Sequence, residues 1–114
     1  MLLNDNILVI HGRNGINFVD ICSIIRIEAS SSYSKLFLTG GRTMVVTIVL
    51  KNFEEKLIDK GFVRVHRSHL VNSSSIQAYN SSDMKIVLRN NEQITISRRR
   101  SMDIRKRLTT RRAA

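Results

Sequence analysis

The sequence predicts a mainly β protein, with antiparallel strands in small packed sheets, one central helix and one short C-terminal helix. Short runs of β-branched residues recur along the chain, separated by turns rich in Gly, Asn and Ser. Helical spacing of apolar residues is sustained only near the middle of the chain. With 114 residues, 42% of them hydrophobic and none of them proline, the chain fits one folded domain. We place its core at about residues 7–108 and a basic tail at 109–114.

The N-terminal elements are a hairpin and a third strand. Strands at 7–10 and 16–19 flank residues 11–15, where two glycines and an asparagine favour a hairpin loop. The strand at 24–29 alternates apolar residues with Arg and Glu. It leads into a polar loop, which we expect to cover residues 30–34.

The strongest turn signal is the pair Gly40–Gly41. It lies between predicted strands at 35–39 and 42–46. A two-residue primed turn needs positive φ at both central residues, which glycine adopts freely. We therefore expect a second hairpin here.

One amphipathic helix is predicted at 48–59. Thr47 is available as its N-cap, and Gly61 is placed to take the left-handed conformation after its end. Its apolar residues recur at helical spacing; they are Ile48, Leu50, Phe53, Leu57 and Ile58.

The C-terminal half returns to short strands and ends in a helix. We expect a helix over 98–108, with Ser97 as its cap and Ile104 and Leu108 as its small apolar contact. The strands expected before it are 62–66, 76–79, 85–89 and 93–96.

Several functional classes find no support in the sequence. The longest apolar run, 44–50, is too short to span a membrane, and the first ten residues lack the features of a secretory signal, so we expect a cytoplasmic protein. The single cysteine, Cys22, excludes an internal disulfide, and we expect it in the core together with the four phenylalanines. The three histidines lack metal-ligand spacing, and no catalytic motif occurs. We expect no enzyme activity, metal or cofactor.

The charge is concentrated in one half of the chain. Residues 1–60 carry seven basic and six acidic side chains, whereas residues 61–114 carry twelve and three, within a net charge of +10. Such asymmetry favours a polyanionic partner, because each neutralised phosphate releases counterions. The alternative is a solubilising basic surface or tail. A protein-interaction or membrane-surface module would need a basic amphipathic helix, and it is disfavoured because the 98–108 helix has little apolar face.

Single-stranded nucleic acid is a poorer candidate than duplex DNA. Residues 60–65 partly match the run found in RNA-recognition strands, but Arg64 stands where that run has its second stacking aromatic. The chain has only four Phe and two Tyr, so stacking platforms are scarce. A nonspecific RNA-binding or ribosome-associated domain remains the alternative.

Three segments of the sequence resemble a known family. They read IIRIEASSSYSKLFL (24–38), GFVRVHRSHLVN (61–72) and ITISRRR (94–100), in that order and with the predicted helix between the first two. The middle segment is close to the run G-F-x-R-x-H-R-S-x-x-V-N. The chain resembles the LytTR DNA-binding domain of bacterial transcription regulators, from about residue 7 to residue 108.

The resemblance implies sequence-specific binding of double-stranded DNA by loops that enter the major groove. Such domains commonly follow a receiver domain, so a receiver or sensor partner outside this chain is expected, and two copies on a repeated DNA site. The contacts that the resemblance implies are Ser32, Tyr33, Ser34, Lys35, Arg67, Ser68, His69, Arg98, Arg99 and Arg100.

The residue pattern by itself leaves several roles open. In a strand from Phe62, Arg67 follows the face of Val63 and Val65, so it lies where that face leaves the core. It can then read a guanine edge, clamp a phosphate or form a surface ion pair. His66 fits a hydrogen-bonded structural role better than a DNA contact.

Other basic and aromatic side chains also have two interpretations. Arg64 fits sheet packing and phosphate contact equally well, Arg99 can read a base or hold a phosphate, and Tyr33 can touch DNA or brace its loop. The distal basic side chains fit diffuse electrostatic contact or a solvated tail; they are Arg105, Lys106, Arg107, Arg111 and Arg112.

Overall fold

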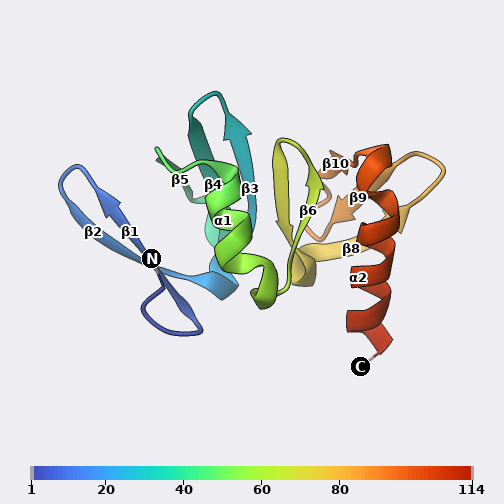
Figure 1. Ribbon diagram of the computed structural model, residues 1–114, viewed down its shortest axis with the longest axis horizontal. Helices are drawn as coiled ribbons and strands as arrows, with labels where there is room; N and C mark the ends of the chain where they lie inside the picture. Colours follow the sequence, from blue (N-terminus) through green and yellow to red (C-terminus); the bar gives the residue numbers. More distant parts are fainter. Residues whose placement is uncertain (1, 114) are drawn as a thin grey trace.

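The described residues fold into three antiparallel sheets and two α-helices, so the predicted mainly β class is confirmed (Figure 1). The computed structural model describes the backbone of residues 2–113 and the side chains of residues 2–110. The strands are β1 (Ile7–Gly12), β2 (Gly15–Asp20), β3 (Ile24–Ser30), β4 (Tyr33–Leu38), β5 (Thr43–Val46), β6 (Phe62–His66), β7 (His69–Asn72), β8 (Ile76–Asn80), β9 (Lys85–Leu88) and β10 (Gln93–Thr95). The helices are α1 (Leu50–Leu57) and α2 (Ser101–Ala113).

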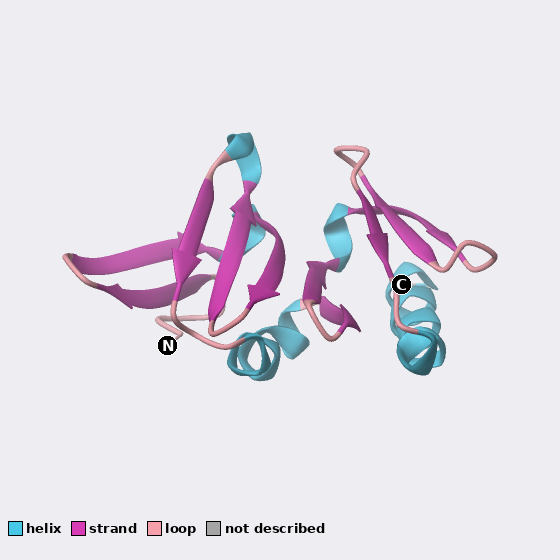
Figure 2. Ribbon diagram, turned by 90° about the horizontal axis from the view of Figure 1, so that it is seen from above, coloured by secondary structure: helices cyan, strands magenta, loops and turns pink. Residues whose placement is uncertain are grey.

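The first sheet is the hairpin β1–β2, which lies at one end of the molecule (Figures 1 and 2). Gly12 pairs with Gly15, so the turn consists of Arg13 and Asn14 and is tighter than the loop expected at 11–15. Side chains alternate between the two faces of the hairpin, so one face is buried against the protein and the other faces solvent.

The central sheet has the strand order β5-β4-β3-β7-β6. The polar loop expected at 30–34 is instead a two-residue turn, because Ser30 pairs with Tyr33. Ser31 takes a left-handed φ of 58° in this turn. Gly40 and Gly41 have the expected positive φ, but their turn is longer than two residues, since the Leu38 amide bonds to the Arg42 carbonyl.

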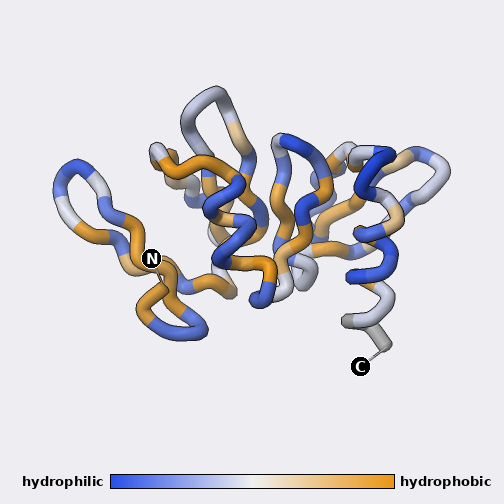
Figure 3. Tube along the Cα trace, in the orientation of Figure 1, coloured by the Kyte–Doolittle hydropathy of each residue, from blue (hydrophilic) through white to orange (hydrophobic). Residues whose placement is uncertain are grey.

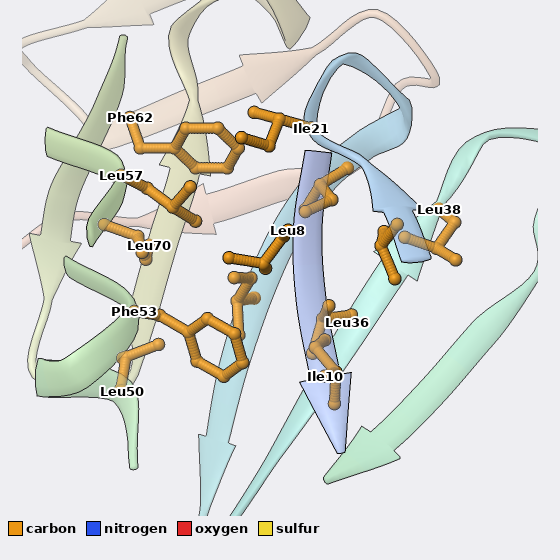
Figure 4. Close-up of a cluster of buried hydrophobic side chains, with 13 residues drawn as sticks. Leu8, Ile10, Ile21, Leu36, Leu38, Leu50, Phe53, Leu57, Phe62 and Leu70 are labelled. Carbon is orange, nitrogen blue, oxygen red and sulfur yellow. The ribbon is translucent and has the colours of Figure 1, made fainter. Parts of the chain in front are cut away.

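Helix α1 covers one face of this sheet and begins later than predicted. Thr47 is not its cap: the chain enters through extended Val49, which makes no side-chain capping bond. A 3-10 turn at 58–60 ends at Gly61, whose φ of 89° confirms its predicted role. Figure 4 shows the core beneath the helix, formed by Leu8, Ile10, Val19, Ile21, Ile24, Ile27, Leu36, Leu38, Leu50, Phe53, Leu57, Phe62 and Leu70.

A second core lies between the central sheet and the three-stranded sheet β10-β9-β8. Strand β6 separates the two cores, because Phe62 enters the first while Val63 and Val65 enter the second. The second core consists of Val63, Val65, Val71, Ile76, Ile86, Leu88, Ile94, Ile96, Ile104 and Leu108.

Helix α2 runs further than the sequence predicts. Arg98–Arg100 form a 3-10 turn and residues 101–113 form the helix, so residues 109–113 are not a separate tail. Ser97 stands at the N-cap position without a side-chain capping bond. The side chains of Arg111 and Arg112, and all of Ala114, lie outside the described residues.

Two predicted core residues are exposed instead. Phe18 is 63% exposed, because Val19 takes the inward-facing position on β2. Cys22 is exposed in a 3-10 turn whose buried residue is Ile21. Phe53 and Phe62 are buried as predicted, and Phe37 is half-buried. Within residues 2–113, no helix is long and apolar enough to cross a membrane.

Candidate nucleic-acid interface

Three segments that are far apart in the sequence meet along one edge of the molecule, the upper side of Figure 1. They are the β3–β4 turn (31–32), the β6–β7 turn (67–68) and the 3-10 turn 98–100, and we call them together the basic edge. The Ala29 amide donates to the Ser68 carbonyl at 2.9 Å, which joins the first segment to the second. The Ser97 amide donates to the Val65 carbonyl at 2.8 Å, which joins the second to the third.

The β3–β4 part of the edge presents fewer side chains than predicted. Ser32 and Tyr33 are exposed and Lys35 is half-buried, with Tyr33 and Lys35 on the same face of β4. Ser34 points to the opposite face, where it is fully buried and its hydroxyl donates to the Ile48 carbonyl at 2.5 Å. The prediction of Ser34 as a contact residue is therefore wrong, because strand alternation turns it into the protein.

Hydrogen bonds donated by Arg64 and accepted by His66 shape the β6–β7 turn. Arg64 donates from Nε to the His66 carbonyl at 2.8 Å and from Nη2 to the Arg67 carbonyl at 2.6 Å. Its Nη1 donates to Glu54 of α1 at 2.7 Å. The Ser68 amide donates to Nδ1 of His66 at 3.1 Å, which confirms the structural interpretation of His66.

The guanidinium groups of the basic edge have no carboxylate partners among the described side chains. Among the described side chains, Arg26, Lys60, Arg64 and Arg107 are paired with Asp or Glu. Within the same set, no ion pair involves any of the four arginines on the edge, which are Arg67, Arg98, Arg99 and Arg100. Arg67, Arg98 and Arg99 are exposed and Arg100 is half-buried.

The position of the triple-arginine turn adds to this positive charge. Arg98–Arg100 lead directly into α2, so their guanidiniums lie near the positive end of the helix macrodipole. Like charge at a helix N-terminus opposes folding locally, and an anion bound there would remove that cost.

A buried arginine connects the central sheet to the β9–β10 turn behind the edge. The Arg26 side chain is 8% exposed; its Nη1 donates to Glu28 at 2.8 Å and its Nη2 donates to Glu92 at 3.1 Å. Its guanidinium carbon lies 3.7 Å from the centre of the Phe37 ring. The hydrogen bond from Arg26 lowers the pKa of Glu92. This cluster therefore links the central sheet to the β9–β10 turn of the three-stranded sheet.

His69, a predicted contact, lies beside this cluster instead of projecting from the edge. Its Nδ1 is buried without a hydrogen-bond partner, 3.9 Å from Glu28, and its ring centre is 5.4 Å from that of His66. Burial lowers the pKa of His69, and the charge of Arg26 acts in the same direction while Glu28 opposes it. The neutral form of His69 is therefore favoured in the folded protein.

We expect the stability to fall as the pH falls below the ordinary histidine pKa of 6.5. Because the folded state has the lower His69 pKa, the unfolded chain binds more protons in this window, and stability present above 6.5 is lost on acidification. Denaturant unfolding at pH 7.5 and 5.5 measures the decrease in the free energy of unfolding, and this decrease should be smaller in His69→Gln. Glu92 acts separately, since its lowered pKa affects stability only as the pH falls below 4.5.

A substitution at Arg64 tests the brace of the β6–β7 turn. Arg64→Lys replaces a planar fork by one ammonium, which cannot reach both turn carbonyls and Glu54 together. Losing two such bonds should lower the stability by about 1 to 2 kcal/mol, as measured by denaturant unfolding. DNA binding should weaken too, with a smaller preference at the base pair that depends on Arg67. If the destabilised variant kept the full base-pair preference of the wild type, Arg64 would have a folding role only.

Sequence reasoning missed two parts of this site. The pairing of Arg26 with Glu92 spans 66 residues of sequence and left no local signal. The residue pattern does not separate a bracing role of Arg64 from a phosphate contact, and the signal that favours bracing is its position three residues before the turn, on the face opposite Val63 and Val65. In the part of the chain that is described, no cluster of His, Cys, Asp and Glu could hold a metal ion.

Comparison with known proteins agrees with this geometry. The family model of the LytTr DNA-binding domain matches residues 14–109. A solved structure, "LytTr DNA-binding domain of putative methyl-accepting/DNA response regulator from Bacillus cereus", superposes with a TM-score of 0.75. It is 24% identical, and the match covers 90% of this chain and 96% of that one, which shows a shared fold. No curated protein matches this chain. On the extent of the family match, the chain belongs to the LytTR DNA-binding domain family.

Proposed function

We propose that this LytTR domain binds double-stranded DNA in a sequence-specific manner, with the basic edge entering the major groove. Membership of the family supports DNA binding in transcription regulation. The observation that carries the finer proposal is the gathering of four arginines without carboxylate partners on one edge built from three distant segments. Folding alone gives no reason to collect unpaired like charges in this way.

The segments of the edge have different roles in this proposal. Arg67 projects from a braced turn and reads a guanine through a bidentate contact. Arg98 holds a phosphate at the start of α2, and Arg99 reads a neighbouring base. Tyr33 and Lys35 approach the DNA backbone from β4. Since Ser68 and His69 are half-buried, they shape the surface that Arg67 projects from.

The wider assembly follows from the same proposal. Two copies bind a repeated DNA site in the cytoplasm, and a receiver or sensor outside this chain controls them. Nonspecific RNA binding gains no support, since the exposed Phe and Tyr side chains within residues 2–110 are Phe18 and Tyr33, which lie on different sheets. Stacking of successive bases uses several aromatic rings along one groove.

A salt titration on duplex DNA tests this function. Neutralisation of about five to eight phosphates should give log K against log[salt] a slope of about −4 to −7. A sequence obtained by selection from random duplexes should bind more tightly than random duplex at the same salt concentration. Equal affinity for both would contradict specific binding, and a slope near zero would contradict the electrostatic role of the basic edge.

A further inference from the structure

The outer edge of strand β2 is open and unprotected. Its backbone pairs with β1 on one side, and no other described strand pairs with it. Exposed edge strands usually carry Lys, Pro or a bulge that prevents pairing with another chain. Strand β2 reads GINFVD, has a regular register over its whole length and has none of these features.

The outward face of the same strand is apolar. Ile16 and Phe18 are 51% and 63% exposed, and Phe18 lies opposite the half-buried Val9 of β1. Figure 3 shows apolar residues along both strands of the hairpin, with the polar residues gathered at its turn. An unpaired edge together with an apolar face is a surface for another β-strand.

Charge distribution selects the kind of partner. The first sixty residues carry a net charge of +1, whereas the remainder carries +9. The hairpin and helix α2 lie at opposite ends of the longest axis of the molecule (Figure 1). Two copies that meet at their hairpins therefore hold their basic halves as far apart as the fold allows, which makes this the end where like-charged copies repel least.

Strand geometry favours pairing of β2 with itself. In a hairpin closed by a two-residue turn, the N–H and C=O groups of successive residues point alternately towards the partner strand and away from it. Those of Gly15, next to the turn, point towards β1, so those of Ile16 and Phe18 point to the open edge. An antiparallel two-fold pair centred on Asn17 then places Ile16 of one copy opposite Phe18 of the other. A pair centred on Phe18 would instead place Asp20 opposite Ile16, which is less favourable.

We propose that two copies of this chain associate through their β2 edges, antiparallel and centred on Asn17, which joins the two hairpins into one four-stranded sheet. The cross-strand pairs of Ile16 and Phe18 then form a continuous apolar strip with Val9 of each copy. The association leaves the basic edge of both copies uncovered and requires no DNA.

Cross-linking tests the register. In the Cys22→Ser background, Asn17→Cys places two thiols at the two-fold axis, in a pair with a Cα separation of about 4.5 Å, within disulfide range. Mild oxidation should convert most of this variant to a covalent dimer without DNA. Gln77→Cys in the same background is the control, because Gln77 is exposed on β8, an edge strand of the other outer sheet, so this variant should form no covalent dimer. Equal cross-linking of both variants, or none in Asn17→Cys, would overturn the register.

Sedimentation equilibrium tests the association itself. The wild-type chain should dimerise reversibly, and Phe18→Lys should weaken dimerisation at least tenfold. Val45→Lys is the matched control: Val45 is 61% exposed on β5, so this substitution adds the same charge outside the proposed contact. Circular dichroism confirms that both variants fold. A wild-type chain that stays monomeric at millimolar concentration, or equal weakening by both substitutions, would overturn the proposal and leave the β2 edge to a strand of a different protein.

Discussion

Arg67→Ala is expected to abolish the preference for one or two base pairs of the DNA site. In the structure the Arg67 backbone carbonyl accepts a hydrogen bond from Arg64, while the Arg67 side chain is exposed and has no carboxylate partner within residues 2–110. A bidentate contact to guanine contributes about 1 to 3 kcal/mol of discrimination, or roughly 5-fold to 150-fold. Selection from random duplexes, with wild-type and variant side by side, measures the loss at each position.

Arg98→Ala is the matched control for this prediction. Both residues are exposed arginines on the same edge, but a phosphate contact carries no sequence information. The Arg98 variant should bind every duplex more weakly to the same degree and lower the salt slope by about one. If Arg67→Ala keeps the full sequence preference and loses thermal stability instead, Arg67 is a structural residue and the β6–β7 turn does not read bases.

Arg26→Met is expected to cause the largest loss of stability. The substitution keeps a long apolar stem but leaves Glu28 and Glu92 without their shared cation. Removing one partner of a buried ion pair costs about 3 to 5 kcal/mol. The carboxylates of Glu28 and Glu92 are 39% and 38% exposed, so water solvates them again after the substitution. We therefore expect the free energy of unfolding to fall by about 2 to 3 kcal/mol, as measured by denaturant unfolding at pH 7.

Two conservative variants show which contact of Arg26 matters. Glu92→Gln keeps a hydrogen-bond acceptor in the β9–β10 turn while removing its charge, and Glu28→Gln does the same within the central sheet. Each should cost less than Arg26→Met, since each leaves the guanidinium one charged partner. A loss below about 1 kcal/mol in Arg26→Met would show that an apolar side chain over Phe37 replaces the cluster adequately.

Local pattern predicted the elements well where one signal dominated. The helix around Leu50 to Leu57 and its end at Gly61 follow from apolar spacing and from a glycine that can take positive φ. The boundaries were less predictable. The Ser30–Ser34 run contains no strand former except Tyr33, yet pairing with β3 and β5 draws Tyr33 and Ser34 into β4.

The sequence by itself determined the mainly β class, the approximate positions of the first three hairpin turns, the excess of positive charge after residue 60 and the family resemblance, because each depends on neighbours along the chain or on composition. It predicted neither strand β7 nor the β6–β7 turn. Only the tertiary structure decided which side chains face outward. Strand parity buries Ser34 and exposes Phe18, while long-range pairing occupies Arg26 and Arg64 with carboxylates and leaves Arg67 and the triple-arginine turn unpaired. The physical reason is that sheet register and ion pairing are set by contacts between distant segments, and such contacts leave no periodic trace in the sequence.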